Sequence, residues 1–196
     1  SIWAIVNDFA LASPAPELRI ALLTFGNKGH AAANGWVRVD AEFTEDLDLI
    51  SQRLFALKTN GGTEYGGRVL QASLERLSWT PRADALKLIV VAGNESAAQD
   101  HVVTFQSQCR AAIERGITVN AFYCGKLHDK VVPEWRQVAR LADGKFAAID
   151  QSGTVALQSP YDAEIHKLSM RLSQTYIPVG ASGQAKWANQ MVQDRN

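Results

Sequence analysis

Apolar residues recur along the chain in two patterns, one with the spacing of strands and one with that of helices. Near-continuous apolar runs at residues 18–25, 86–92 and 117–124 predict strands that are covered on both faces. Between them, apolar positions three and four residues apart predict amphipathic helices. The clearest inner face of a helix consists of Trp135, Val138, Ala139 and Ala142. Strands that alternate with helices are typical of an α/β domain with a mostly parallel sheet.

Residues 36–43 have a different pattern, because apolar and polar side chains alternate strictly there. This alternation predicts an antiparallel strand at a sheet edge, with one face toward solvent. Thr44 is expected to cap the following helix. A later helix is expected to begin after His101 and to bury Val102 and Phe105.

Two polar loops flank a predicted helix that ends at Ser78. Gly61-Gly62-Thr63-Glu64 precedes this helix, and we expect Thr63 to be its N-cap. The strand at 86–92 then ends in Gly93-Asn94-Glu95. In an open α/β sheet, ligands bind at the loops that follow the carboxyl ends of the strands. We therefore expect an interaction surface formed by Asn27, Gly62, Asn94 and Glu95.

The arrangement resembles a von Willebrand factor type A (VWA) domain of bacterial type. The resemblance depends on the Gly-Gly-Thr run at 61–63, the apolar strand and polar turn at 88–95, and the order of elements over residues 1–150. It implies a three-layer Rossmann-like α/β fold, with a mostly parallel sheet, one antiparallel edge strand, and helices on both faces.

The same resemblance implies how the chain is divided. The order of elements matches the family plan without its first strand, so residues 1–173 are expected to be a VWA-like domain truncated at its N-terminus. An upstream segment is expected to supply the central strand between 18–25 and 86–92. Residues 174–196 are expected to be a C-terminal extension with a short amphipathic helix at 184–193.

The family also has a metal-ion-dependent adhesion site, which binds a divalent cation and captures an acidic partner. It uses an Asp-x-Ser-x-Ser motif, a later Thr, and an Asp after the fourth strand. In this sequence Thr63 matches the Thr, whereas Gly93-Asn94-Glu95 brings no Asp to the end of its strand. Because a hard cation needs several oxygen ligands, the site is expected to be degenerate or incomplete. No cofactor is expected, unless an upstream Asp-x-Ser-x-Ser segment completes a Mg²⁺ site.

Composition excludes some classes of partner. The chain has 196 residues, 46% of them hydrophobic, with 20 basic and 20 acidic side chains. This balance predicts no nucleic-acid partner, and no apolar run is long enough to span a membrane. Cys109 and Cys124 are expected to be free thiols, because their predicted positions are too far apart for a disulfide. The resemblance favours a periplasmic or secreted location.

Three functions are compatible with these observations. The first is a non-catalytic protein-interaction or adhesion domain with an unidentified protein partner. The second is an α/β enzyme that binds a nucleotide or phosphate. No strand is followed by Gly-x-Gly-x-x-Gly, and the sequence holds neither Gly-x-x-x-x-Gly-Lys-Ser/Thr nor Gly-x-Ser-x-Gly. The third is a structural module of a larger assembly. We expect the first.

Overall fold

The computed structural model describes residues 17–150 together with residues 167, 168, 171 and 184. The chain divides into two compact units, Ser1–Ser152 and Gly153–Asn196. The hydrophobic pattern also predicts a helix over residues 1–11 and a final domain helix over residues 162–173. The first of these helices, and nearly all of the second and of the C-terminal extension, lie outside the described residues. The following description concerns residues 17–150.

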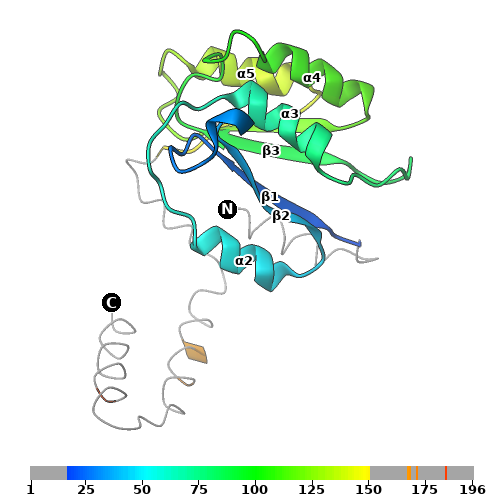
Figure 1. The fold of residues 1–196 in the computed structure, drawn as a ribbon, viewed down its shortest axis with the longest axis vertical. Helices are drawn as coiled ribbons and strands as arrows, with labels where there is room; N and C mark the ends of the chain where they lie inside the picture. The colour runs from blue at the N-terminus through cyan, green and yellow to red at the C-terminus, as the bar shows by residue number, and fades with distance from the viewer. Residues whose placement is uncertain (1–16, 151–166, 169–170, 172–183, 185–196) are drawn as a thin grey trace. The chain divides into compact units, whose positions relative to one another are not determined.

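Residues 17–150 alternate between strands and helices, as the hydrophobic pattern predicts (Figure 1). In chain order the strands are β1 (Ile20–Phe25), β2 (Val37–Thr44), β3 (Leu88–Gly93), β4 (Thr118–Tyr123) and β5 (Phe146–Ala148). The α-helices are α2 (Leu47–Phe55), α3 (Gly66–Arg76), α4 (Phe105–Glu114) and α5 (Val132–Leu141), and a short 3-10 helix, η1, spans Ala32–Asn34. The α/β class is therefore confirmed.

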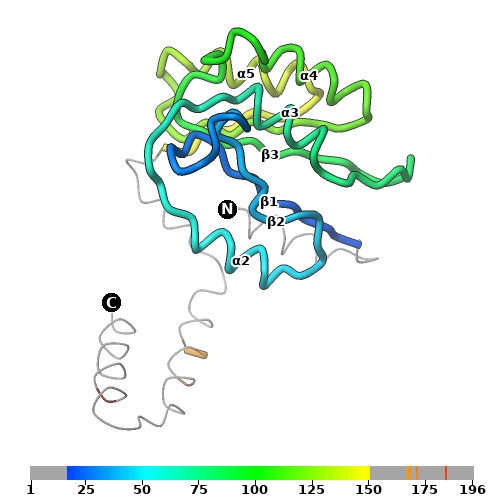
Figure 2. The backbone as a smooth tube through the Cα atoms, in the orientation of Figure 1, coloured from blue at the N-terminus to red at the C-terminus, as the bar shows by residue number. Residues whose placement is uncertain are grey.

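The five strands form two sheets. β1 and β2 pair antiparallel, with a register shift near Leu22, and β3, β4 and β5 pair parallel in that order. In Figure 2 the trace passes from β1 to β2 through the loop that holds η1, but reaches β3 only after α2 and α3. β1 and β3 thus belong to different sheets and do not pair with each other, although both are apolar along their length.

The main core lies between β4 and the helices α3, α4 and α5, which form a layer above β3 in Figure 1. β4 alternates, with Val119, Ala121 and Tyr123 buried against the helices. The predicted inner face of α5 is confirmed, because Trp135, Val138 and Ala139 are each 2% exposed and Ala142 is fully buried. Among the described residues, no helix is both long and apolar enough to cross a membrane.

Several predicted helix starts are wrong. The N-cap of α2 is Asp46, whose carboxylate accepts a hydrogen bond from the Leu49 N–H. The Thr44 hydroxyl accepts a hydrogen bond from the Asp46 N–H and so lies before the cap. α4 begins at Phe105 behind Thr104, so Val102 lies outside the helix and is 83% exposed. In each case a second polar residue a few positions away competes for the cap, and the packing of the helix decides between them.

The two cysteines are free, as predicted. Cys109 is fully buried on α4, and burial raises the pKa of its thiol to about 12. Cys124 is half-buried directly after β4.

Candidate functional site

Three loops meet where β1 and β3 end. Gly62 lies against the turn that follows β1, since a Cβ on Gly62 would be 2.7 Å from the Gly26 carbonyl oxygen and 3.1 Å from the Lys28 nitrogen. Glu64 lies between Gly26 and Gly93, because a Cβ on either glycine would contact its side chain at 2.6 Å or 3.4 Å respectively. The glycines therefore let these loops approach one another closely.

Glu64 links the loop before α3 to the loop after β3. Its half-buried carboxylate accepts hydrogen bonds from the backbone N–H groups of Asn94 and Glu95. Burial raises the pKa of Glu64, and the neighbouring Glu95 carboxylate raises it further, while the two N–H donors act in the opposite direction. Thr63, which precedes Glu64, and Asn94 consequently lie at the same end of the molecule.

Thr63 does not cap α3, contrary to the sequence-based expectation. The N-cap of α3 is Tyr65, which makes no side-chain capping bond. Thr63 lies in the loop two residues earlier and is exposed. Its hydroxyl makes no hydrogen bond within the part of the chain that the structure describes. This hydroxyl is therefore available to a ligand.

The four other predicted surface residues divide into two kinds. Asn27 and Gly62 hold loops together: the Asn27 amide donates to the Lys58 carbonyl at 2.8 Å and accepts from the Gly29 N–H at 2.7 Å. Asn94 and Glu95 are exposed, so their side chains face solvent. The face open to a partner consists of Thr63, Asn94 and Glu95, which we call the loop face.

The loop that carries Asn94 and Glu95 is anchored on α5. The Trp135 indole N–H donates to the Glu95 carbonyl at 2.8 Å, and its ring packs against Gly93. One turn-forming residue, Ser96, donates to the Glu134 carboxylate at 2.6 Å, and the Ala98 N–H reaches the same oxygen at 3.3 Å. α5 thereby fixes the backbone below the loop face.

A buried carboxylate closes the far end of the same loop. Asp100 is 6% exposed, forms an ion pair with Arg68 of α3, and accepts from the N–H groups of Val102 and Val103 at 2.8 and 3.1 Å. Burial alone raises the pKa of Asp100, but the hydrogen bonds from Arg68 and the two N–H groups outweigh burial and hold the pKa below its ordinary value. Asp100 is therefore a structural anion.

Asp100→Asn should lower the free energy of unfolding at pH 7 by about 2 kcal/mol, less than for a fully buried pair because Arg68 is partly exposed. A depressed carboxyl pKa adds stability above about pH 4, and that stability disappears as the pH falls through the folded-state pKa. Urea unfolding at pH 7 and pH 3 should therefore show the difference shrinking at pH 3. The matched control is Asp84→Asn, which alters an exposed ion pair with Arg82 and should change neither value. A pH-independent loss would contradict this role.

Sequence reasoning missed two residues of this region, Glu64 and His30. The sequence pattern indicates only that Glu64 is an acidic residue near the start of a helix. Its position directly after Gly-Gly-Thr is the signal that could have placed it at the strand ends together with Thr63. His30 lies in a loop that reads as small and polar, yet it is 7% exposed. His101 and His128 are both exposed.

Comparisons with known proteins give similarity in structure only. No protein-family model matches the sequence, and no curated protein is similar to it. The VWA domain of SpRpn10 superposes with a TM-score of 0.54 and 13% identity over 85% of this chain and 79% of that one. An aerotolerance-related membrane protein from Bacteroides fragilis gives 0.47 and 16% over 68% and 73%. At such identities the likeness concerns the fold, and the first superposition is the one that supports it.

Proposed function

We propose that this chain, which has the fold of a von Willebrand factor type A domain, is a non-catalytic module that binds a protein partner through the loop face. The observation that supports this proposal most is the convergence of three loops on Glu64, which leaves Thr63, Asn94 and Glu95 exposed side by side. Their backbone is fixed by Trp135 and Glu134 from below. A rigid frame with exposed polar tips reduces the entropy lost on binding.

The packed centre of the described residues offers no enclosed site for a small molecule. Where α3, β3, α4 and α5 meet, side chains including Leu70, Val91, Phe105 and Trp135 leave no space for a water molecule. Small-molecule sites, by contrast, are concave and bury most of their ligand. The polar groups of the loop face stand outside this packed region.

The three-layer arrangement is part of the proposal. β3 is apolar from Leu88 to Ala92, as expected for a strand inside a sheet, yet Val90 is 40% exposed and Ala92 is exposed too. β1 is equally apolar and only half-buried. We propose that a strand from outside residues 17–150 lies between β1 and β3 and joins the two sheets into one.

The described residues do not make a cation site by themselves. No group of three or more His, Cys, Asp and Glu side chains within them could hold a metal ion. The Thr63 hydroxyl is a suitable but single oxygen ligand. We propose that Mg²⁺ binds only if an Asp-x-Ser-x-Ser segment preceding Ser1 joins Thr63.

Titration calorimetry of the 196-residue chain with Mg²⁺, Mn²⁺ and ATP should show no heat of binding. A heat with ATP would favour the enzyme function.

Reversing the charge at Glu95 should abolish partner binding, because Glu95 is exposed on the loop face while its backbone carbonyl keeps its bond to Trp135. Glu95→Lys and Glu114→Lys should be compared by affinity capture and mass spectrometry. Glu114 is exposed at the carboxyl end of α4, which faces the opposite end of the strands, so this variant is the control. A protein retained by the wild type and by Glu114→Lys, but lost with Glu95→Lys, supports the proposal. Equal retention by both variants would exclude the loop face.

A further inference from the structure

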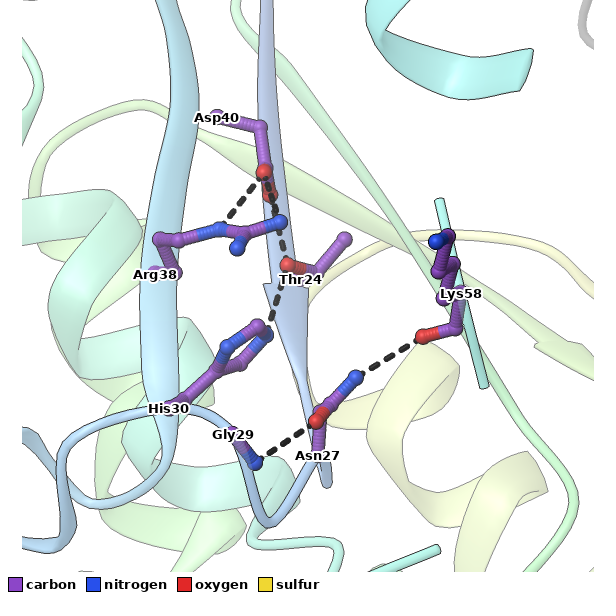
Figure 3. Close-up of polar contacts among 7 residues, drawn as sticks. All are labelled: Thr24, Asn27, Gly29, His30, Arg38, Asp40 and Lys58. Atoms are coloured by element: carbon purple, nitrogen blue, oxygen red, sulfur yellow. Dashed lines mark hydrogen bonds and ion pairs between the residues drawn. The ribbon is translucent and has the colours of Figure 1, made fainter. Parts of the chain in front are cut away.

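A polar cluster lies on β1, on β2 and on the turn that follows β1. Figure 3 shows the Thr24 hydroxyl between the His30 imidazole and the Asp40 carboxylate, with the Arg38 guanidinium beside Thr24, between Asp40 and the His30 ring. The Thr24 oxygen lies 2.9 Å from His30 Nε2 and 2.5 Å from Asp40 Oδ2. Arg38 Nε donates to Asp40 Oδ1 at 2.7 Å. We call these four residues the His30 cluster.

The cluster fixes the proton on the imidazole. The Thr24 hydroxyl has one proton, which it donates to the Asp40 carboxylate. Its contact with His30 must therefore be a hydrogen bond donated by Nε2–H, so the neutral ring carries a lone pair on Nδ1. His30 Nδ1 is buried and has no hydrogen-bond partner among the described residues. Protonation of Nδ1 would thus create a buried N–H donor with no acceptor, which is costly.

The surroundings oppose the imidazolium for the same reason. Burial lowers the pKa of His30, the Arg38 guanidinium lowers it further, and the Asp40 carboxylate acts in the opposite direction. Arg38 and Asp40 are the charged groups that face the ring from β2, and β1 contributes the neutral Thr24. The neutral ring therefore fits the folded cluster better than the charged ring does.

His30 ends the turn that holds the loop face in place. Its backbone N–H donates to the Asn27 carbonyl at 2.9 Å, and Asn27 in turn bonds to the Lys58 carbonyl (Figure 3). Gly26, at the start of this turn, contacts Gly62 and Glu64. The side chain of His30 thereby connects β1 and β2 to the loop that carries Thr63.

We propose that His30 is a pH-sensitive latch: the neutral ring fastens turn 26–30 to β1 and β2, and protonation of Nδ1 releases the turn and loosens the loop face. The inference rests on the proposed function only where it links release of the turn to binding at the loop face. The latch itself needs no partner. A histidine that is disfavoured as a cation in the folded state adds stability above about pH 6.5 that is lost as the pH falls below it.

Amide hydrogen exchange resolved by NMR, between pH 7.5 and pH 5.0, tests the latch in the 196-residue chain. The reporters are the Gly29 and His30 amides, which bond to Asn27, and the controls are the Val119 and Ala121 amides at β4. After correction for intrinsic exchange, protection of the reporters should fall by up to about tenfold for each pH unit below about 6.5. Protection of the β4 amides should not change.

His30→Gln removes the titration while retaining a side-chain N–H donor for Thr24, so its reporters should lose the pH dependence. His128→Gln, at an exposed position, should behave like the wild type. The latch is overturned if the wild-type reporters keep their protection at pH 5.0, if the pH dependence survives in His30→Gln, or if the β4 amides lose protection in parallel. Because no partner is present, these outcomes are independent of those obtained with Glu95→Lys.

Discussion

Gly67→Ala should lower the free energy of unfolding by about 3 kcal/mol and the melting temperature by about 6–12 °C. Gly67 is in the first turn of α3, where a Cβ would be 1.9 Å from the Val103 carbonyl oxygen and 2.9 Å from the Thr104 carbonyl carbon. Both are backbone atoms, so relief requires α3 to move away from the segment before α4. Thermal unfolding followed by circular dichroism measures the effect.

The sign of this result is informative, because alanine is a better helix former than glycine by about 1 kcal/mol. If the close approach were absent, Gly67→Ala would stabilise the protein. Gly61→Ala is the control: Gly61 has φ +35° and no atom within 4 Å of an added Cβ, so its cost is limited to backbone strain of about 1 kcal/mol. Equal losses in the two variants would contradict the packing of α3 described above.

Trp135→Ala should lower the free energy of unfolding by about 4 kcal/mol, within the range of buried aromatic truncations. Trp135 is 2% exposed, packs against Gly93, and bonds to the Glu95 carbonyl. The substitution therefore opens a cavity in the core and releases the loop after β3. Urea unfolding measures the first effect, and exchange of the Asn94 and Glu95 amides, which bond to Glu64, measures the second.

Trp135→Phe separates these two effects. Phenylalanine restores most of the apolar volume but leaves the Glu95 carbonyl without its donor, a cost of about 1–3 kcal/mol. We expect intermediate stability together with full release of the Asn94 and Glu95 amides. If those amides stay protected in Trp135→Phe, their bonds to Glu64 and the bond from Ser96 to Glu134 hold the loop without the indole, and the anchoring role of the indole is wrong.

The parts of the fold that sequence predicted are those decided by local periodicity. The inner face of α5 repeats over three turns with Pro133 near its start, and its predicted residues are buried. β2 alternates in sequence and is antiparallel, as predicted, although the side chain of Asp40, on the face expected to meet solvent, is 7% exposed. In such elements one face must be buried, so the pattern alone fixes what faces inward.

Features that depend on distant residues could not be predicted. His30 is buried because Thr24 and Asp40, which are 6 and 10 positions away in the sequence, give it polar neighbours where two strands and a turn meet. Glu64 takes its role from amides on the loop after β3. Thr44 and Thr63 have the right residue type for capping, but Asp46 and Tyr65 occupy those positions. Residue type and spacing do not distinguish such alternatives.

The apolar strand β3 has a further consequence for handling the protein. Leu88–Gly93 is an uncharged run rich in β-branched residues, and within the described residues it has a paired neighbour, β4, on one side. When a run of this composition lies at an open sheet edge, it can act as a template on which other molecules add strands and aggregate. A charged residue next to such a run opposes aggregation. Lys87 supplies one immediately before the run, whereas the residue immediately after it, Asn94, is uncharged. Colloidal stability at high concentration therefore depends on whatever shields this edge.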